Sequence, residues 1–203
     1  SLNQINVLTA KNKENNYGET GQTPASGEKA YGIRVTANNG TAGGLIGSAS
    51  DKVTELTIQN TAVSGSGTAD QIEAGSSAGG LIGDTRAAST TVSSSMASLY
   101  VRSEGNGGNK GGSSSTDGAG GLIGSASGNV TVENSYSGGR TTNADNPEKK
   151  AGDASAMQAR YIDSAKGQGR YNVQLAKGSG AAGGLIGKYT GTGSGLTVSD
   201  SYS

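Results

Sequence analysis

The six residues Ala-Gly-Gly-Leu-Ile-Gly at positions 42–47 occur four times in this chain, and the other copies lie at 78–83, 119–124 and 182–187. The intervals between the copies are unequal. A short unit that returns at unequal intervals is typical of a solenoid in which equivalent coils are separated by insertions of different length. The sequence therefore predicts a repeat protein in which this unit occupies the same place in every coil.

A second motif follows every copy, and the positions that align between the copies lie two residues apart along the chain. The apolar positions are Ile58, Val92, Val132 and Val198. The polar positions two residues later are Asn60, Ser94, Asn134 and Asp200, and two further on come Ala62, Met96, Tyr136 and Tyr202. A step of two is the period of a β-strand. A weaker strand pattern precedes each copy, at 33–35, 71–72, 99–101 and 171–175.

These patterns predict about three short strands in each repeat, joined by turns rich in Gly, Ser and Asn. One such unit cannot bury its own apolar face, but stacked units can. We therefore expect an all-β fold, a right-handed parallel β-helix (β-solenoid), in which equivalent residues form ladders along the axis. One interior ladder should contain Leu45, Leu81, Leu122 and Leu185, and the apolar residues of the second motif should form another.

Three further positions of the repeat have a predicted structural role. The glycines should serve corners and close approaches between backbones, where a Cβ would clash. The Ile that follows each Leu should point inward or be covered by an insertion. The polar ladder that contains Asn60 and Asn134 has two interpretations, which are stacking of buried amides and hydroxyls and a corner turn with Asx geometry.

The composition limits both the core and the chemistry. The 203 residues include 37 glycines and no Phe, Trp, His or Cys, so the core must be thin and built from Leu, Ile, Val and Ala. The 16 basic and 16 acidic residues balance, so no strong field favours nucleic acid. No apolar run reaches the roughly 18 residues of a membrane span. Without His and Cys, Ser-His and Cys-His catalysis and the best zinc ligands are excluded.

No phosphate-binding loop, dinucleotide fingerprint or calcium nonapeptide stands out in the sequence. An enzyme built on a β-helix needs charged residues that converge on one groove. The acidic candidates fall at non-equivalent places, mostly in turns, and are Asp51, Glu55, Asp70, Glu73 and Asp84. We therefore predict that the protein is not an enzyme and has no catalytic, cofactor-binding or metal-binding residue and no cofactor.

The pairing of the two motifs resembles the GLUG motif of bacterial proteins. It is clearest where AGGLIG at 119–124 is followed by VENSY at 132–136, and it extends over about residues 31–203. The first two copies end in Thr-Ala at 61–62 and Ser-Met at 95–96, so they lack the Ser-Tyr ending. The resemblance implies a β-helical segment outside a bacterial cell, as in adhesin-like surface proteins and non-catalytic regions of immunoglobulin-A-cleaving metallopeptidases. It implies no catalytic residue.

We expect one solenoid domain over residues 1–203, interrupted by insertions at 10–30, 103–118 and 139–170. The segment 103–118 is rich in Gly and Ser and should be a mobile loop. In the third insertion, the helical spacing of Ala154, Met157, Tyr161 and Ala165, between Asp153 and Lys166, predicts a short helix over 153–166. Strand patterns at 5–8 and 197–202 would leave coils unfinished, so we expect a fragment of a longer solenoid or end-to-end packing with another copy.

The leading functional hypothesis is an extracellular structural or adhesive segment at a bacterial cell surface. Its expected partners are host or polymer surfaces, either glycan or protein, and not nucleic acid. A carbohydrate-binding module is one alternative, and its sign would be tyrosines aligned on one exposed face. The candidates for that face are Tyr100, Tyr136, Tyr171, Tyr189 and Tyr202. A non-catalytic part of a secreted peptidase is a further alternative.

Overall fold

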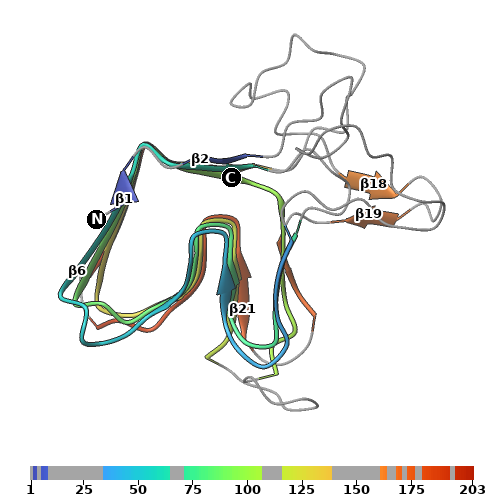
Figure 1. Cartoon of the computed structure of the whole chain (residues 1–203), viewed down its shortest axis with the longest axis horizontal. Helices are drawn as coiled ribbons and strands as arrows, with labels where there is room; N and C mark the ends of the chain where they lie inside the picture. Colours follow the sequence, from blue (N-terminus) through green and yellow to red (C-terminus); the bar gives the residue numbers. More distant parts are fainter. Residues whose placement is uncertain are drawn as a thin grey trace, which may run out of the picture.

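The chain is a stack of short parallel strands, and equivalent strands of successive coils overlay when the molecule is viewed along the stack (Figure 1). The computed structural model describes residues 2–3, 6–8, 34–64, 71–106, 116–138, 161–163, 168–170, 173–176, 180–192 and 195–203. Its parallel strands form five sheets, which we name A to E, and each complete coil passes through them in the order C, D, E, A, B. The prediction of a parallel β-solenoid is confirmed.

Within each of these sheets the strands stack in chain order. Sheet A contains β1 (Leu2–Asn3), β6 (Glu55–Gln59), β11 (Ser89–Ser93), β16 (Asn129–Glu133) and β23 (Leu196–Ser199). Sheet B contains β2 (Asn6–Leu8), β7 (Ala62–Ser64), β12 (Met96–Ser98) and β17 (Tyr136–Gly138), and sheet C contains β3 (Arg34–Ala37), β8 (Gln71–Ala74), β13 (Tyr100–Ser103) and β20 (Val173–Leu175). Sheet D contains β4 (Ala42–Gly43), β9 (Ala78–Gly79), β14 (Gly118–Gly120) and β21 (Ala181–Gly183), and sheet E contains β5 (Ile46–Ala49), β10 (Ile82–Thr85), β15 (Ile123–Ala126) and β22 (Ile186–Tyr189).

A complete coil holds five strands, so the expectation of about three was wrong. Two of the three sequence patterns each contain two strands. The AGGLIG unit turns sharply after its second residue, which separates a strand of sheet D from a strand of sheet E. The second motif bends at its polar position, which separates a strand of sheet A from a strand of sheet B. A step-of-two pattern does not reveal such breaks, because the alternation resumes after the bend.

The glycines of AGGLIG allow the strands of sheets D and E to pack backbone against backbone. A Cβ added to Gly79 would lie 1.9 Å from the carbonyl oxygen of Ile82, and one added to Gly120 would lie 1.8 Å from that of Ile123. The last glycine of the unit faces the preceding coil, since a Cβ on Gly124 would lie 2.4 Å from the carbonyl oxygen of Gly83. Such separations leave no space for any side chain. The repeated glycines are therefore required by contact between main chains, as predicted.

The interior is filled by ladders of aliphatic residues, and the central coils bury them completely. Leu81 and Leu122 are fully buried, whereas Leu45 and Leu185 of the outer coils are half-buried. Ile58, Val92 and Val132 are fully buried, but Val198 of the last coil is 46% exposed. The Ile that follows each Leu points inward, as expected; Ile82 and Ile123 have no exposed surface. Burial thus depends on having a coil on both sides.

The polar ladder forms a corner between sheets A and B. All four of its residues are exposed and adopt positive φ, with values of 49° at Asn60, 47° at Ser94, 47° at Asn134 and 46° at Asp200. This left-handed conformation favours Asn and Asp among residues with a Cβ, because their short polar side chains can bond locally. The corner-turn interpretation is therefore confirmed, and the buried stacking of amides is wrong.

Replacing Asn134 with valine should lower the free energy of unfolding by about 1–2 kcal/mol, because a β-branched side chain is strained at positive φ. Asn134→Gly should stay within about 0.5 kcal/mol of the parent, since glycine accepts this conformation. Urea unfolding followed by circular dichroism compares the two variants. Equal stability of the valine and glycine variants would contradict the corner geometry.

The insertions join the solenoid at two corners, and the structure corrects two predictions about them. The expected helix over 153–166 is wrong where it can be checked, because β18 (Tyr161–Asp163) pairs antiparallel with β19 (Gln168–Arg170). The rest of that segment lies outside the described residues. The insertion at 103–118 was expected to be mobile, but Asn106 and Asp117 near its ends are buried. Residues 107–115 lie outside the described part.

The described part of the chain contains no helix with the length and apolar character needed to cross a bilayer.

Candidate functional site

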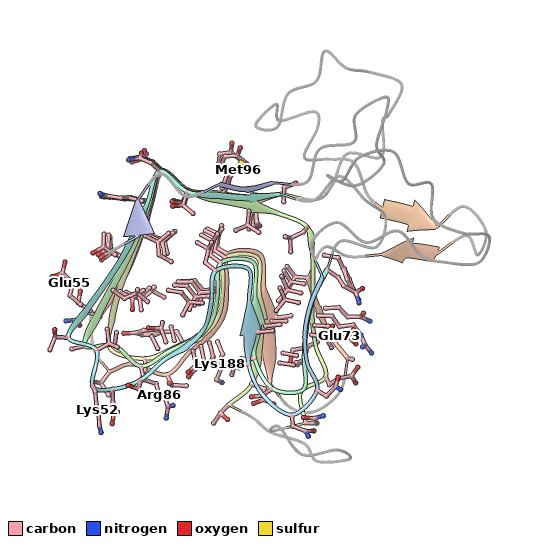
Figure 2. All side chains as sticks on the ribbon, viewed as in Figure 1. Lys52, Glu55, Glu73, Arg86, Met96 and Lys188 are labelled. Carbon is pink, nitrogen blue, oxygen red and sulfur yellow. The ribbon has the colours of Figure 1, made fainter. Side chains whose placement is uncertain are left out.

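A polar groove of about 380 Å³ runs between the outer surface of sheet E and the turns that connect sheets C and D. Its lining residues come from four successive coils and are Thr41, Ser76, Ser77, Asp84, Arg86, Thr116, Asp117, Ser125, Ala126, Ser127 and Thr190. Seven of these side chains carry hydroxyl groups, two carry carboxylates and one carries a guanidinium. In Figure 2, Arg86 and Lys188 both lie on the lower side of the coils.

The fold of sheet E directs one residue of every strand toward the groove. On neighbouring strands of sheet E, Asp84 pairs with Ser48 on one side and with Ser125 on the other. Lys188 pairs with Ser125 and continues the same row. The next residue along the strand, Thr85, is fully buried because side chains alternate across a strand. A single outward row of Ser, Asp, Ser and Lys therefore follows from the same alternation that fills the core.

Hydrogen bonds hold the charged side chains of the groove in place. The hydroxyl of Ser125 donates to Asp84 Oδ1, and Arg86 Nε lies 3.4 Å from Asp84 Oδ2. On the opposite wall, the hydroxyl of Ser76 donates to Asp117 Oδ1 over 2.9 Å. Asp117 is only 3% exposed, whereas the Arg86 side chain is 59% exposed. The groove thus presents the carboxylate of Asp84 and the cation of Arg86, with Lys188 in the same outward row, while Asp117 is buried in the opposite wall.

The acidic residues considered in the sequence are not brought together. Asp51 lies in an exposed turn, Glu55 lies on sheet A, Glu73 lies on sheet C and only Asp84 lines the groove. Asp70 is outside the described residues. The second carboxylate of the groove, Asp117, lies in the loop insertion and could not be aligned with the repeat. Among the described residues, no three acidic, His or Cys side chains gather closely enough to hold a metal ion.

The tyrosines do not form a common exposed face in the described structure. Tyr136 and Tyr202 stack with ring centroids 5.3 Å apart and an interplanar angle of 9°. Because the two rings stack on each other between successive coils, the faces between them are covered. Tyr100 lies on sheet C and bonds to Gln174, and Tyr189 packs against the core and donates to the Gly128 carbonyl.

Tyr171 lies outside the described residues.

The stability of the solenoid should fall at high pH through Tyr136. Burial raises the pKa of Tyr136 above its ordinary value of 10.0, and the neighbouring Tyr202 adds to the shift. The unfolded chain releases this proton near pH 10 while the folded chain retains it, so the contribution is complete below pH 10 and is lost as pH rises above it. Urea unfolding between pH 9 and 11.5 should show a smaller loss in Tyr136→Phe. If the parent chain and Tyr136→Phe lost stability equally as the pH rises, Tyr136 would not be the source of the loss.

Two further surface features extend across coils. On sheet C, Arg102 Nη1 lies 2.6 Å from Glu73 Oε1 and also pairs with Glu104, while Gln71 donates to Glu73 over 3.1 Å. On sheet A, register aligns four threonines into a single outward row, consisting of Thr57, Thr91, Thr131 and Thr197. The Arg102–Glu73 pair links two successive coils, whereas the threonine row follows from the register, and Thr57 donates to Glu55 of its own strand.

No protein-family model matches the chain, and no curated protein or solved structure shows significant similarity to it.

Proposed function

We propose that this chain is an extracellular structural and adhesive solenoid segment of a bacterial surface or secreted protein. The observation that supports this proposal is the in-register stacking of every sheet across the coils. Each coil adds about 4.8 Å of length and pairs its backbone with its neighbours along the axis. A rod built in this way can hold a binding surface at a distance from its attachment. The extracellular location is supported by the resemblance of the repeat to GLUG proteins.

Labelling of intact cells tests the location. An antibody against the folded segment should label the surface of intact producing bacteria or recover the protein from their medium. Beads that carry the segment should then bind to glycan-coated or glycoprotein-coated surfaces more often than beads that carry an unfolded control variant. Signal that appears only after cell lysis would contradict the extracellular proposal, and equal retention of both kinds of bead would contradict the adhesive one.

A second candidate role is end-to-end association of the solenoid with another copy. Three large apolar side chains in and after β23 are exposed: Leu196 is 39% exposed, Val198 is 46% exposed and Tyr202 is 41% exposed. Uncovered strand edges with apolar residues readily pair with other chains.

Strand numbers restrict how two copies can stack end to end. Among the described strands, sheet A has five members, whereas sheets C, D and E have four each. If β1 of one copy paired with β23 of another, the order of sheets in a coil would leave a gap of one strand in sheets C, D and E. We therefore rank self-association second. Sedimentation velocity should show mass increasing with concentration, and Val198→Lys should abolish the increase. A monomer at all concentrations would contradict this role.

A non-catalytic region of a secreted peptidase is the remaining alternative, and it is supported by the resemblance alone.

A further inference from the structure

We propose that the polar groove beside sheet E binds a neutral, hydroxyl-rich oligosaccharide that lies along the solenoid axis. This inference names the ligand class for the proposed adhesive function and so rests on it in part. The binding itself concerns only the residues of the groove, and it can be measured on the isolated chain.

The shape of the groove fits an extended chain of small units. Its lining begins at Thr41 in the first complete coil and ends at Thr190 in the last. Three steps between coils of about 4.8 Å give a length of about 14 Å. The volume of about 380 Å³ lies within the range of small-molecule sites. A ligand in this groove would meet at least one hydroxyl group from every coil, which suits a polymer of repeated units.

The chemistry of the lining matches the hydroxyl groups of a sugar. A sugar hydroxyl both donates and accepts hydrogen bonds. The carboxylate of Asp84 accepts, the guanidinium of Arg86 donates, and the serine and threonine hydroxyls do either, while the buried Asp117 already accepts from Ser76. Hydrogen bonds to charged groups are the stronger ones. Asp84 and the exposed Arg86 should therefore provide most of the affinity.

The same lining disfavours the other polymers that could occupy it. The carboxylates of Asp84 and Asp117 are balanced by Arg86 and by Lys188 of the same outward row, so the groove offers no net positive charge to attract acidic glycans or nucleic acid. Peptides usually anchor through apolar or aromatic side chains in matching pockets. Among the lining residues, only Ala126 has an apolar side chain. A neutral glycan needs neither a positive field nor an apolar pocket.

The groove is already organised before any ligand binds. Asp84 is held by Ser125 and Arg86, and Asp117 is held by Ser76. The hydroxyl of Thr41 donates to the Gly47 carbonyl over 2.7 Å, which ties the start of sheet D to sheet E. Groups that are fixed in advance lose little conformational entropy on binding. The missing aromatic platform should limit the affinity, so we expect dissociation constants in the micromolar to millimolar range.

Isothermal titration calorimetry of the full chain tests the proposal with linear neutral hexasaccharides, namely maltohexaose, cellohexaose and xylohexaose. Oligogalacturonate serves as the acidic probe and a polyglycine-serine peptide as the peptide probe. At least one neutral hexasaccharide should bind, and Arg86→Ala should weaken that binding at least about tenfold. The matched control is Arg102→Ala, which removes an ion-paired arginine from sheet C and should change affinity less than twofold. Circular dichroism confirms that both variants are folded.

Several results would overturn the proposal. These are the absence of binding to all neutral hexasaccharides, binding to the acidic or peptide probe alone, and equal effects of the two arginine substitutions. Asp84→Asn provides a second variant, because it keeps the shape of the groove while it removes one charge, and it should also weaken binding. The two proposals can fail separately. If the beads do not adhere but the chain still binds a hexasaccharide, the adhesive function is rejected and the groove proposal stands.

Discussion

Replacing Gly120 with alanine is expected to lower the free energy of unfolding by about 3 kcal/mol or more, or to prevent folding. The added Cβ would lie 1.8 Å from the Ile123 carbonyl oxygen and 2.6 Å from the Gly187 amide nitrogen. Both atoms belong to the main chain, so no side-chain rotation can relieve the overlap. The strands of sheets D and E would have to separate in two successive coils. Urea unfolding followed by circular dichroism measures the loss.

The same motif offers a matched control at a position without that crowding. Gly47 is the last glycine of the first AGGLIG copy, and the nearest atom to a Cβ built there is the Thr41 carbonyl oxygen at 3.5 Å. Its counterpart in the third copy is Gly124, where the distance to the Gly83 carbonyl oxygen is 2.4 Å. Gly47→Ala should change stability by less than about 1 kcal/mol, while Gly124→Ala should approach the effect at Gly120. Equal effects at Gly47 and Gly124 would contradict contact between coils as the reason for the glycines.

Replacing Leu122 with alanine is expected to lower the free energy of unfolding by about 3–5 kcal/mol. Leu122 has no exposed surface and lies in a coil that is covered on both sides. The substitution removes apolar contacts and leaves a cavity that the rigid backbone of the stacked strands cannot close. Because each coil is stabilised mainly by its neighbours, the damage should extend to the coils on either side.

The control for this variant is Leu185→Ala in the last coil. Leu185 occupies the same ladder position but is only half-buried, so its loss should cost roughly half as much. Unfolding in urea gives both values, and amide hydrogen exchange shows which coils open. Equal costs at Leu122 and Leu185 would show that burial in this ladder does not depend on stacking.

The sequence was sufficient to predict the solenoid and most of its ladders. Apolar residues at a step of two, repeated after each AGGLIG copy, predicted the buried positions of Leu81 and Val92 correctly. The strand pattern at 5–8 was also confirmed, since these residues contain β2. These features follow from local alternation combined with repetition, which a single sequence displays directly.

The remaining features depend on contacts between segments that are distant in the sequence. The number of strands per coil was underestimated because the bends at Gly-Gly and at residues such as Asn134 do not interrupt the alternation. The helix expected over 153–166 rested on local apolar spacing and on Asp153 and Lys166 at its ends, and β-pairing at 161–163 overrides it. The threonine row on sheet A becomes a continuous feature only once the register is known.

The groove was missed for a similar reason. It combines the outward positions of sheet E, where the repeat varies from coil to coil, with turn residues that lie outside both motifs. Asp84 was noted in the sequence as an isolated acid, and Asp117 was part of an insertion expected to be mobile. Their joint lining of one groove depends on the path of the chain through sheets C, D and E. The only signal in the sequence was the recurrence of Ser and Asp directly after AGGLIG.

Disulfide trapping tests the register of the stacked coils most directly, and the absence of cysteine from the chain makes the background clean. Thr91 and Thr131 are directly paired on neighbouring strands of sheet A and both point outward. The double variant Thr91→Cys, Thr131→Cys should form an intramolecular disulfide under mild oxidation, because adjacent strands bring paired residues within bonding range. The pair Thr91→Cys, Asn129→Cys is shifted by two residues and should remain reduced. A disulfide in the shifted pair, or none in the aligned pair, would contradict the parallel in-register solenoid.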